Sequence, residues 1–253
     1  APSRRWSRGR GFFVMFYAAF KETGLALSEK NLLLFRKGSD GSWILRDDVV
    51  SQSTHANRKG VFPGYQKFKD LNGDLQITQE DLTIIGNPNP DFTGGITNTF
   101  RFYNFDMSLF FTFSYGNDIL NMNRYYLEEG RSLSSNQFAS YADRWTVDNP
   151  NGKLPRARSA NNTAWGSDRY VEDGSYLRLK NLNIGYTLPI QVSQRFFVSN
   201  MRIYFSAQNL FTVTGYSGQD PTVSTMSNAR TPGYDYSAYP VPRTFIFGTQ
   251  ISF

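Results

Sequence analysis

The chain has 253 residues, a formal net charge of +6 and no cysteine, so disulfide bonds and thiolate metal sites are excluded. The charge does not indicate nucleic-acid binding, because four arginines lie within the first ten residues and the other basic residues are scattered among acidic ones. The longest apolar run, Phe12–Phe20, is far shorter than the roughly 20 residues of a transmembrane helix, whereas a β-barrel strand needs only alternate apolar residues.

Residues 1–60 stay unassigned. Arg4–Arg10 followed by Phe12–Phe20 has the charged and apolar order of a signal peptide, but the apolar part is rich in aromatic residues, which favours a strand or a strand pair. Asn31–Phe35 and Ser42–Leu45 are further short strand candidates. His55 lies in a polar stretch that is typical of a loop.

Residues 70–81 have the spacing of a calcium-binding loop. Side-chain oxygens fall at positions 1, 3, 5, 9 and 12 of the loop, and a backbone carbonyl is available at position 7. The candidate ligands are Asp70, Asn72, Asp74, Gln76, Thr78 and Asp81. Position 6, usually glycine, is Leu75, for which a left-handed conformation costs about 1–2 kcal/mol. A calcium site and a metal-free hydrogen-bonded turn both remain open.

A first hairpin is expected from strands at 92–102 and 105–115. In the second strand the odd-numbered residues from Phe105 to Tyr115 are all apolar, while most of the even-numbered ones are polar. Because successive side chains point to opposite faces, one face of this strand is apolar. The following segment, 116–173, reads as a long loop rich in Asn, Ser, Tyr, Trp and Arg, a mixture suited to binding polar solutes.

A second hairpin is expected from strands at 176–188 and 201–212, joined by a turn at 189–200. One face of its first strand is predicted to hold Tyr176, Leu182, Ile184, Tyr186 and Leu188, interrupted near the loop end by Arg178 and Lys180. After a long loop at 213–239, residues 244–253 alternate again and end on Phe253. Short turns that alternate with long loops are typical of outer-membrane barrels, in which a final aromatic residue acts as a barrel-assembly signal.

Seven stretches between residues 65 and 253 together resemble the carboxyl-terminal third of the SusC/RagA family of TonB-dependent outer-membrane transporters. They are Phe68–Asp74, Ile84–Gly95, Phe111–Ile119, Asp173–Leu182, Gly185–Pro189, Gln208–Thr212 and Tyr239–Phe245. The resemblance implies an all-β fold, in which residues 61–253 form the C-terminal, antiparallel, transmembrane strands of a large barrel of about 22 strands with long extracellular loops.

The resemblance further implies an active transporter in the outer membrane of a Gram-negative bacterium. Such a transporter imports oligosaccharides or peptides with energy from the TonB complex, and a SusD-like surface lipoprotein closes it as a lid. We expect this chain to be one piece of it, since it lacks the plug region through which TonB acts. The remainder of the barrel is then also a partner, because an open sheet would leave unpaired edges in lipid.

Two other functions remain open: a soluble, calcium-stabilised carbohydrate-binding β-domain and a passive, porin-like barrel. An enzyme is not expected, because His55 is the only histidine available to activate a nucleophile. Aromatic side chains in the long loops are the candidate ligand contacts, since aromatic faces stack on sugars and on peptide side chains. They are Tyr125, Tyr126, Trp145, Trp165, Tyr216 and Tyr236.

Overall fold

The computed structural model describes residues 17–19, 22–25, 35–37, 39, 43–45, 64–128, 130, 136–157, 167–222 and 232–253. The chain forms two compact units. The first comprises Ala1–Asn89, Arg124–Asp168 and Met226–Tyr234, and the second Pro90–Asn123, Arg169–Thr225 and Asp235–Phe253. The signal-like segment up to residue 16, His55 and Trp165 lie outside the described residues. The predicted boundary near residue 60 stays a prediction.

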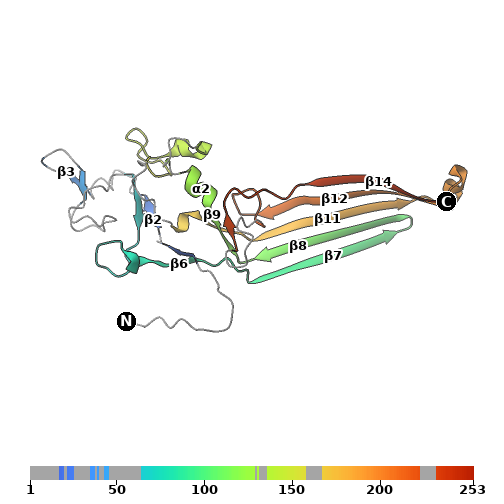
Figure 1. Ribbon diagram of the computed structural model, residues 1–253, viewed down its shortest axis with the longest axis horizontal. Coiled ribbons are helices and arrows are strands. Elements are labelled where there is room, and N and C mark those ends of the chain that lie inside the picture. Colours follow the sequence, from blue (N-terminus) through green and yellow to red (C-terminus); the bar gives the residue numbers. More distant parts are fainter. Residues whose placement is uncertain are drawn as a thin grey trace. The chain divides into compact units, whose positions relative to one another are not determined.

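The second unit contains a five-stranded antiparallel sheet in the order β14-β12-β11-β8-β7 (Figure 1). Its strands are β7 (Phe92–Phe102), β8 (Phe105–Tyr115), β11 (Tyr176–Thr187), β12 (Asn200–Thr214) and β14 (Thr244–Ser252). The first predicted hairpin is confirmed with its bounds, and the other three strands agree with the prediction to within two residues. The expected all-β, antiparallel fold is therefore confirmed, although the described strands do not close into a barrel.

The two faces of this sheet differ in polarity, because residues paired across antiparallel strands share a face. Ile184 on β11 is paired with Met107 on one side and Phe205 on the other, and Phe205 is paired with Phe247. The neighbouring row is polar: Asn183 pairs with Ser108 and Ser206. The first face keeps large apolar side chains exposed, among them Ile96, Phe100, Phe105, Ile203, Phe245, Phe247 and Ile251.

A β-bulge in β11 corrects one prediction about these faces. The register shifts between Leu179 and Asn181 against both neighbouring strands, so the alternation changes parity there. Leu177 and Leu179 before the bulge share the apolar face with Leu182 after it. Tyr176, which was predicted to lie on that face, is paired with Ser114 and Thr214 on the polar face instead. A single inserted residue is sufficient to reverse which side chains face each side.

Arg178 is also on the polar face, paired with Thr112 and Thr212. The prediction that it interrupts the apolar face is therefore wrong. The same bulge places Arg178 on the polar face. That position determines which groups its guanidinium can contact.

The segments predicted as long loops contain short regular elements. Between β8 and β11 lie β9 (Asp118–Asn121), α2 (Met122–Leu127), η2 (Ala139–Asp143), η3 (Asp168–Tyr170) and β10 (Val171–Asp173). Beyond β12 lies β13 (Tyr234–Asp235), and these pieces supply a small sheet in the order β10-β9-β13. The turn between β11 and β12 contains α3 (Ile190–Ser193) and η4 (Gln194–Phe196). No helix in the described residues is long and apolar enough to span a membrane.

The first unit is built from strand pairs. They are β1 (Tyr17–Ala19) with β6 (Thr83–Gly86), β2 (Glu22–Leu25) with β5 (Gln66–Phe68), and β3 (Phe35–Lys37) with β4 (Trp43–Leu45). Phe68 and Ile77 are buried against each other and against Leu82. This small core fixes both ends of the loop at 70–81, whose last turn is η1 (Gln79–Asp81).

Candidate functional site

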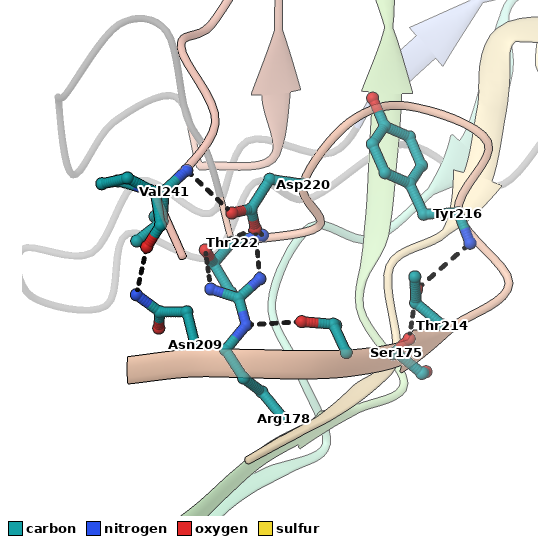
Figure 2. Close-up of polar contacts among 10 residues, drawn as sticks. Ser175, Arg178, Asn209, Thr214, Tyr216, Asp220, Thr222 and Val241 are labelled. Carbon is teal, nitrogen blue, oxygen red and sulfur yellow. Dashed lines mark hydrogen bonds and ion pairs between the residues drawn. The ribbon is translucent and has the colours of Figure 1, made fainter. Parts of the chain in front are cut away.

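Arg178 is the centre of a polar network at the loop end of the large sheet (Figure 2). Its Nε donates to Oγ1 of Thr212 at 2.8 Å, and Nη1 donates to Oγ1 of Thr222 at 3.3 Å. Its Nη2 forms an ion pair with Oδ1 of Asp220 at 2.6 Å. The Arg178 and Asp220 residues are only 6% and 4% exposed. Removing one partner of a pair so well removed from water costs more than on the surface, because the other charge is left buried without compensation.

Asp220 connects this pair to the chain on both sides of it. Its Oδ1 also accepts from the amide nitrogen of Thr222 at 2.9 Å, and its Oδ2 accepts from the amide nitrogen of Val241 at 3.2 Å. Close by, Asn209 donates to the carbonyl oxygen of Pro242 at 3.0 Å. The segments 215–222 and 241–242 are thereby held to β11 and β12, as Figure 2 shows.

The pKa of Asp220 reflects these contacts. Burial by itself raises the pKa of this carboxyl, but hydrogen bonds from Arg178, from the Thr222 side chain and from two backbone amides outweigh burial. The net result is a pKa below the ordinary value for aspartate, so Asp220 is ionised at neutral pH and keeps its charge-assisted bond to the guanidinium.

Glu172 forms a second polar centre, which joins β10 to β9 and to the start of the loop after β12. Its Oε2 accepts from the amide nitrogen of Ser217 at 2.8 Å, and its Oε1 accepts from the Ser217 hydroxyl at 2.8 Å. The same Oε1 accepts from Nδ2 of Asn121 at 3.1 Å, and Asn121 is buried. Asn121 Nδ2 also donates to the Ser217 hydroxyl at 3.3 Å, so three hydrogen bonds fix Ser217 at the beginning of this loop, in addition to those of Asp220.

The predicted ligand contacts in the second unit are Tyr216 and Tyr236, and their environments differ. Tyr216 is 6% exposed, and its hydroxyl donates to Oδ2 of the buried Asp235 at 2.5 Å. Tyr236, the next residue after Asp235, is 44% exposed. Tyr216 therefore supports the loop from inside, whereas Tyr236 presents a ring at the surface.

The other described candidates lie in the first unit. Tyr125 and Tyr126 on α2 contact each other edge to face at 5.1 Å, and Tyr126 is 43% exposed. The ring of Trp145 packs on Gly64, where a Cβ atom would have no room, and the guanidinium of Arg156 lies 5.4 Å from the ring centre. Trp145 is thus held between two partners. Trp165 is outside the described residues.

The loop at 70–81 is closed by its own carboxylates. Asp70 accepts from the amide nitrogens of Gly73 and Leu75, at 2.6 and 2.8 Å. The buried Asp81 accepts from those of Leu71 and Thr78, at 2.7 and 2.8 Å. Leu75 adopts φ +63°, the left-handed conformation that position 6 of a calcium loop requires.

The two interpretations of this loop fit the geometry differently. The backbone has the turn that calcium loops need, and carboxylate oxygens can accept a hydrogen bond and bind a hard cation together. Within the described residues, however, no group of three or more acidic or histidine side chains is placed to hold an ion. Both carboxylates at the ends of the loop already satisfy backbone amides. Calcium binding by this loop stays a prediction.

An ion pair crosses the polar face of the sheet near its short-turn end. Arg202 on β12 donates through Nε and Nη2 to the two carboxylate oxygens of Asp106 on β8, at 3.1 and 2.5 Å. The strand between them, β11, has Gly185 at this level, and a Cβ atom there would lie 2.2 Å from Nη2 of Arg202. Glycine at 185 therefore makes room for a bidentate pair that spans three strands.

Sequence reasoning missed Asp220 and Glu172, which lie at the centre of the polar networks, and it assigned Arg178 to the wrong face. Nothing in the local pattern reveals its partners, which lie 34 to 44 residues further along the chain.

Comparisons with known proteins define the class to which this fold and these loops belong. No protein-family model matches the chain. Among curated proteins, it is 42% identical to TonB-dependent receptor P3 of Formosa agariphila over 196 residues, which are 76% of this chain and 19% of the relative. It is 31% identical to TonB-dependent receptor P26 of the same organism, covering 84% of this chain and 22% of the relative. The chain is therefore related to TonB-dependent receptors and spans about a fifth of their length.

More particularly, TonB-dependent receptor SusC of Bacteroides thetaiotaomicron is 26% identical over 74% of this chain and 17% of its own length. Among solved structures, that of the RagAB peptide transporter matches with a TM-score of 0.64 and 24% identity, covering 94% of this chain and 23% of that chain. The predicted resemblance to SusC and RagA is thus confirmed. At this identity the structural match shows the fold alone, shared with about a quarter of that chain. These relatives are receptors and transporters, not enzymes.

Proposed function

We propose that this chain is part of an outer-membrane transporter that imports oligosaccharides or peptides with TonB-derived energy and a SusD-like lipoprotein lid. The observation that supports it most directly is the five-stranded sheet, with one face of exposed aromatic and aliphatic side chains and one polar face. Strands in lipid alternate in this way, apolar outward and polar inward. The relationship to TonB-dependent receptors supports TonB as the source of the energy for transport.

The unpaired edges of the sheet support a partner within the same barrel. In the described residues, β7 and β14 each pair with one neighbour only. An open edge in hydrocarbon leaves backbone amides and carbonyls without hydrogen bonds, at a cost of several kcal/mol for each group. The remainder of the barrel is the partner that satisfies both edges.

The mass and composition of the particle that contains this chain test the proposal. Gentle extraction of outer membranes should yield a detergent-dependent particle several times heavier than 28.9 kDa, with plug-bearing sequence and a lipoprotein. A detergent-independent particle near 28.9 kDa would contradict the proposal and favour the soluble β-domain. A membrane particle that has neither plug nor lipoprotein would favour the passive, porin-like barrel.

The aromatic loop residues are proposed as ligand contacts, with Tyr126 and Tyr236 as the most accessible of the described ones. Alanine at each should weaken the affinity of the transporter for its oligosaccharide or peptide. Phenylalanine at the same positions should retain most of it, because the stacking face is preserved. Unchanged affinity in both alanine variants would remove these two rings from the binding surface.

Calcium at the 70–81 loop is proposed as a stabiliser and not as part of transport. If calcium is bound, a chelator lowers the thermal stability of the transporter, and Asp74→Ala abolishes that sensitivity. Equal melting temperatures with and without chelator would instead establish the metal-free, hydrogen-bonded turn.

A further inference from the structure

The connection between β11 and β12, residues 188–199, exposes large apolar side chains next to polar ones such as Gln191 and Arg195. Ile190 is 58% exposed, Phe196 62% and Phe197 93%. The residues on its inside are Ser193, which is fully buried, and Val198, which is 8% exposed. A short helical turn in water normally does not expose two adjacent aromatic rings to this extent, because exposed rings gain nothing there.

The backbone holds Phe197 in this exposed position at some strain. It caps η4 with φ +58° and ψ +30°, the left-handed region, and its amide nitrogen donates to the carbonyl oxygen of Gln194. Glycine adopts that conformation freely, whereas a bulky side chain there is an outlier. The β7–β8 turn repeats the feature, because Tyr103 has φ +52° and is 91% exposed.

Hydrogen bonds place these turns at one end of the sheet. The amide nitrogen of Thr187, where β11 ends, donates to the carbonyl oxygen of Asn104 in the β7–β8 turn at 2.9 Å. The amide nitrogen of Ser199 donates to the carbonyl oxygen of Ser252, the last residue of β14, at 2.9 Å. Tyr103 and Phe197, both exposed and on strained backbone, therefore belong to neighbouring turns at the same end of the sheet.

The apolar face of the sheet continues to this end. Phe105, the first residue of β8, contacts Tyr186 on β11 with a ring separation of 4.5 Å, and Phe102 beside the turn is 71% exposed. The connection adds one exposed cation, Arg195, next to Phe196. Rings beside a basic side chain suit the layer where hydrocarbon meets lipid head groups, since aromatic residues are enriched there and anionic lipids attract cations.

We propose that the β11–β12 connection inserts into the phospholipid head-group layer at the short-turn end of the sheet, with Phe196 and Phe197 as its membrane anchors. The connection is then part of the membrane-contacting surface and not a turn suspended in water. Tyr103 of the neighbouring turn extends the same contact. This inference rests on the membrane orientation of the sheet proposed above.

Spin-label accessibility tests the inference, and the absence of cysteine from this chain makes single labels straightforward. Labels are introduced by F196C and F197C in the intact receptor, in which any cysteine outside this chain is replaced. The receptor is reconstituted in vesicles of phosphatidylethanolamine and phosphatidylglycerol. Q191C is the matched control, because Gln191 is an exposed polar residue of α3 in the same connection. F247C, on the apolar face of β14, is the reference for hydrocarbon.

The labels at 196 and 197 should show a severalfold higher ratio of oxygen to nickel-chelate accessibility than the label at 191. A ratio equal to that at 191 would overturn the inference, because the two aromatic residues would then lie no deeper than an exposed polar residue of the same connection. Labels inaccessible to both reagents would also overturn it, since they would show a protein partner. The label at 247 distinguishes failure of this inference from failure of the proposed membrane orientation. If the label at 247 is in water, the membrane orientation of the sheet is wrong.

Discussion

Replacing Arg178 by methionine is the sharpest test of the network at the loop end. The substitution keeps a long, unbranched side chain and removes the guanidinium, so it separates packing from charge. It deletes the donors to Thr212, Thr222 and Asp220 together. Asp220 is then left as a buried carboxylate with only neutral donors.

Removing one partner of a buried ion pair costs about 3–5 kcal/mol, because the other charge remains without compensation. Asp220 keeps its hydrogen bonds from the amide nitrogens of Thr222 and Val241, which places the expected cost at the lower end, about 3 kcal/mol. Every 1.4 kcal/mol is a factor of ten, so the loop should open about 100-fold more often.

Amide hydrogen exchange of the reconstituted receptor measures this opening directly. Peptides that cover 215–222 and 235–243 should lose about two orders of magnitude of protection in R178M, and the amide of Val241 should be among those affected. R195M is the control, since Arg195 is exposed at the other end of the sheet and should leave the loop unchanged. In the double variant R178M/D220N the loss should be smaller than the sum of the single losses. Parental protection throughout the loop in R178M would refute the reasoning.

Three further predictions follow from the described contacts. Because the folded pKa of Asp220 is below the usual value of about 3.9, its contribution to stability is present above that value and lost as the pH falls through the folded pKa; loop protection should hold at neutral pH and fall below about pH 4. This acid-dependent fall should be weaker in R178M, because the guanidinium no longer lowers the pKa of Asp220 there. Gly185→Ala displaces the side-chain ends of the Asp106–Arg202 pair and should lower the free energy of unfolding by about 1 kcal/mol. The control is Gly215→Ala, which should leave the melting temperature nearly unchanged or slightly raised, because no atom lies within 4 Å of its Cβ. Leu75→Gly removes left-handed backbone strain of about 1–2 kcal/mol, but the greater freedom of glycine in the unfolded chain costs about 0.5–1 kcal/mol of stability. The melting temperature should therefore rise slightly. A fall would show that the leucine side chain stabilises the loop.

The long strands could be predicted from the sequence because their alternation is uninterrupted. In β8 the apolar residues from Phe105 to Tyr115 keep one parity, and the strand has the bounds that its pattern indicates. In β12, Phe205 and Phe211 stay on the same face although an irregularity separates them, because they are six positions apart, an even spacing. Where period-2 alternation survives, the sequence predicts which side chains lie on the apolar face.

The bulge in β11 and the polar networks could not be predicted, for different physical reasons. A bulge adds one residue without changing composition, and the pattern from Tyr176 to Leu188 fits either face until the pairing partners are known. The chain returns through β12 and so brings the partners of Arg178 close to it. No local sequence pattern indicates such a contact between distant segments. The aromatic candidates were chosen by residue type alone, and burial distinguishes Tyr216 from Tyr236 only in the folded chain.

The two ends of the large sheet are stabilised in opposite ways, which bears on function without reference to any relative. At the loop end, charged groups such as Arg178 and Asp220 are buried and paired, so a loop surrounded by water keeps a defined shape. At the turn end, the rings of Tyr103 and Phe197 are exposed on strained backbone. This asymmetry supports the proposed membrane orientation, in which the shaped loops bind ligand on one side and the turns contact lipid on the other.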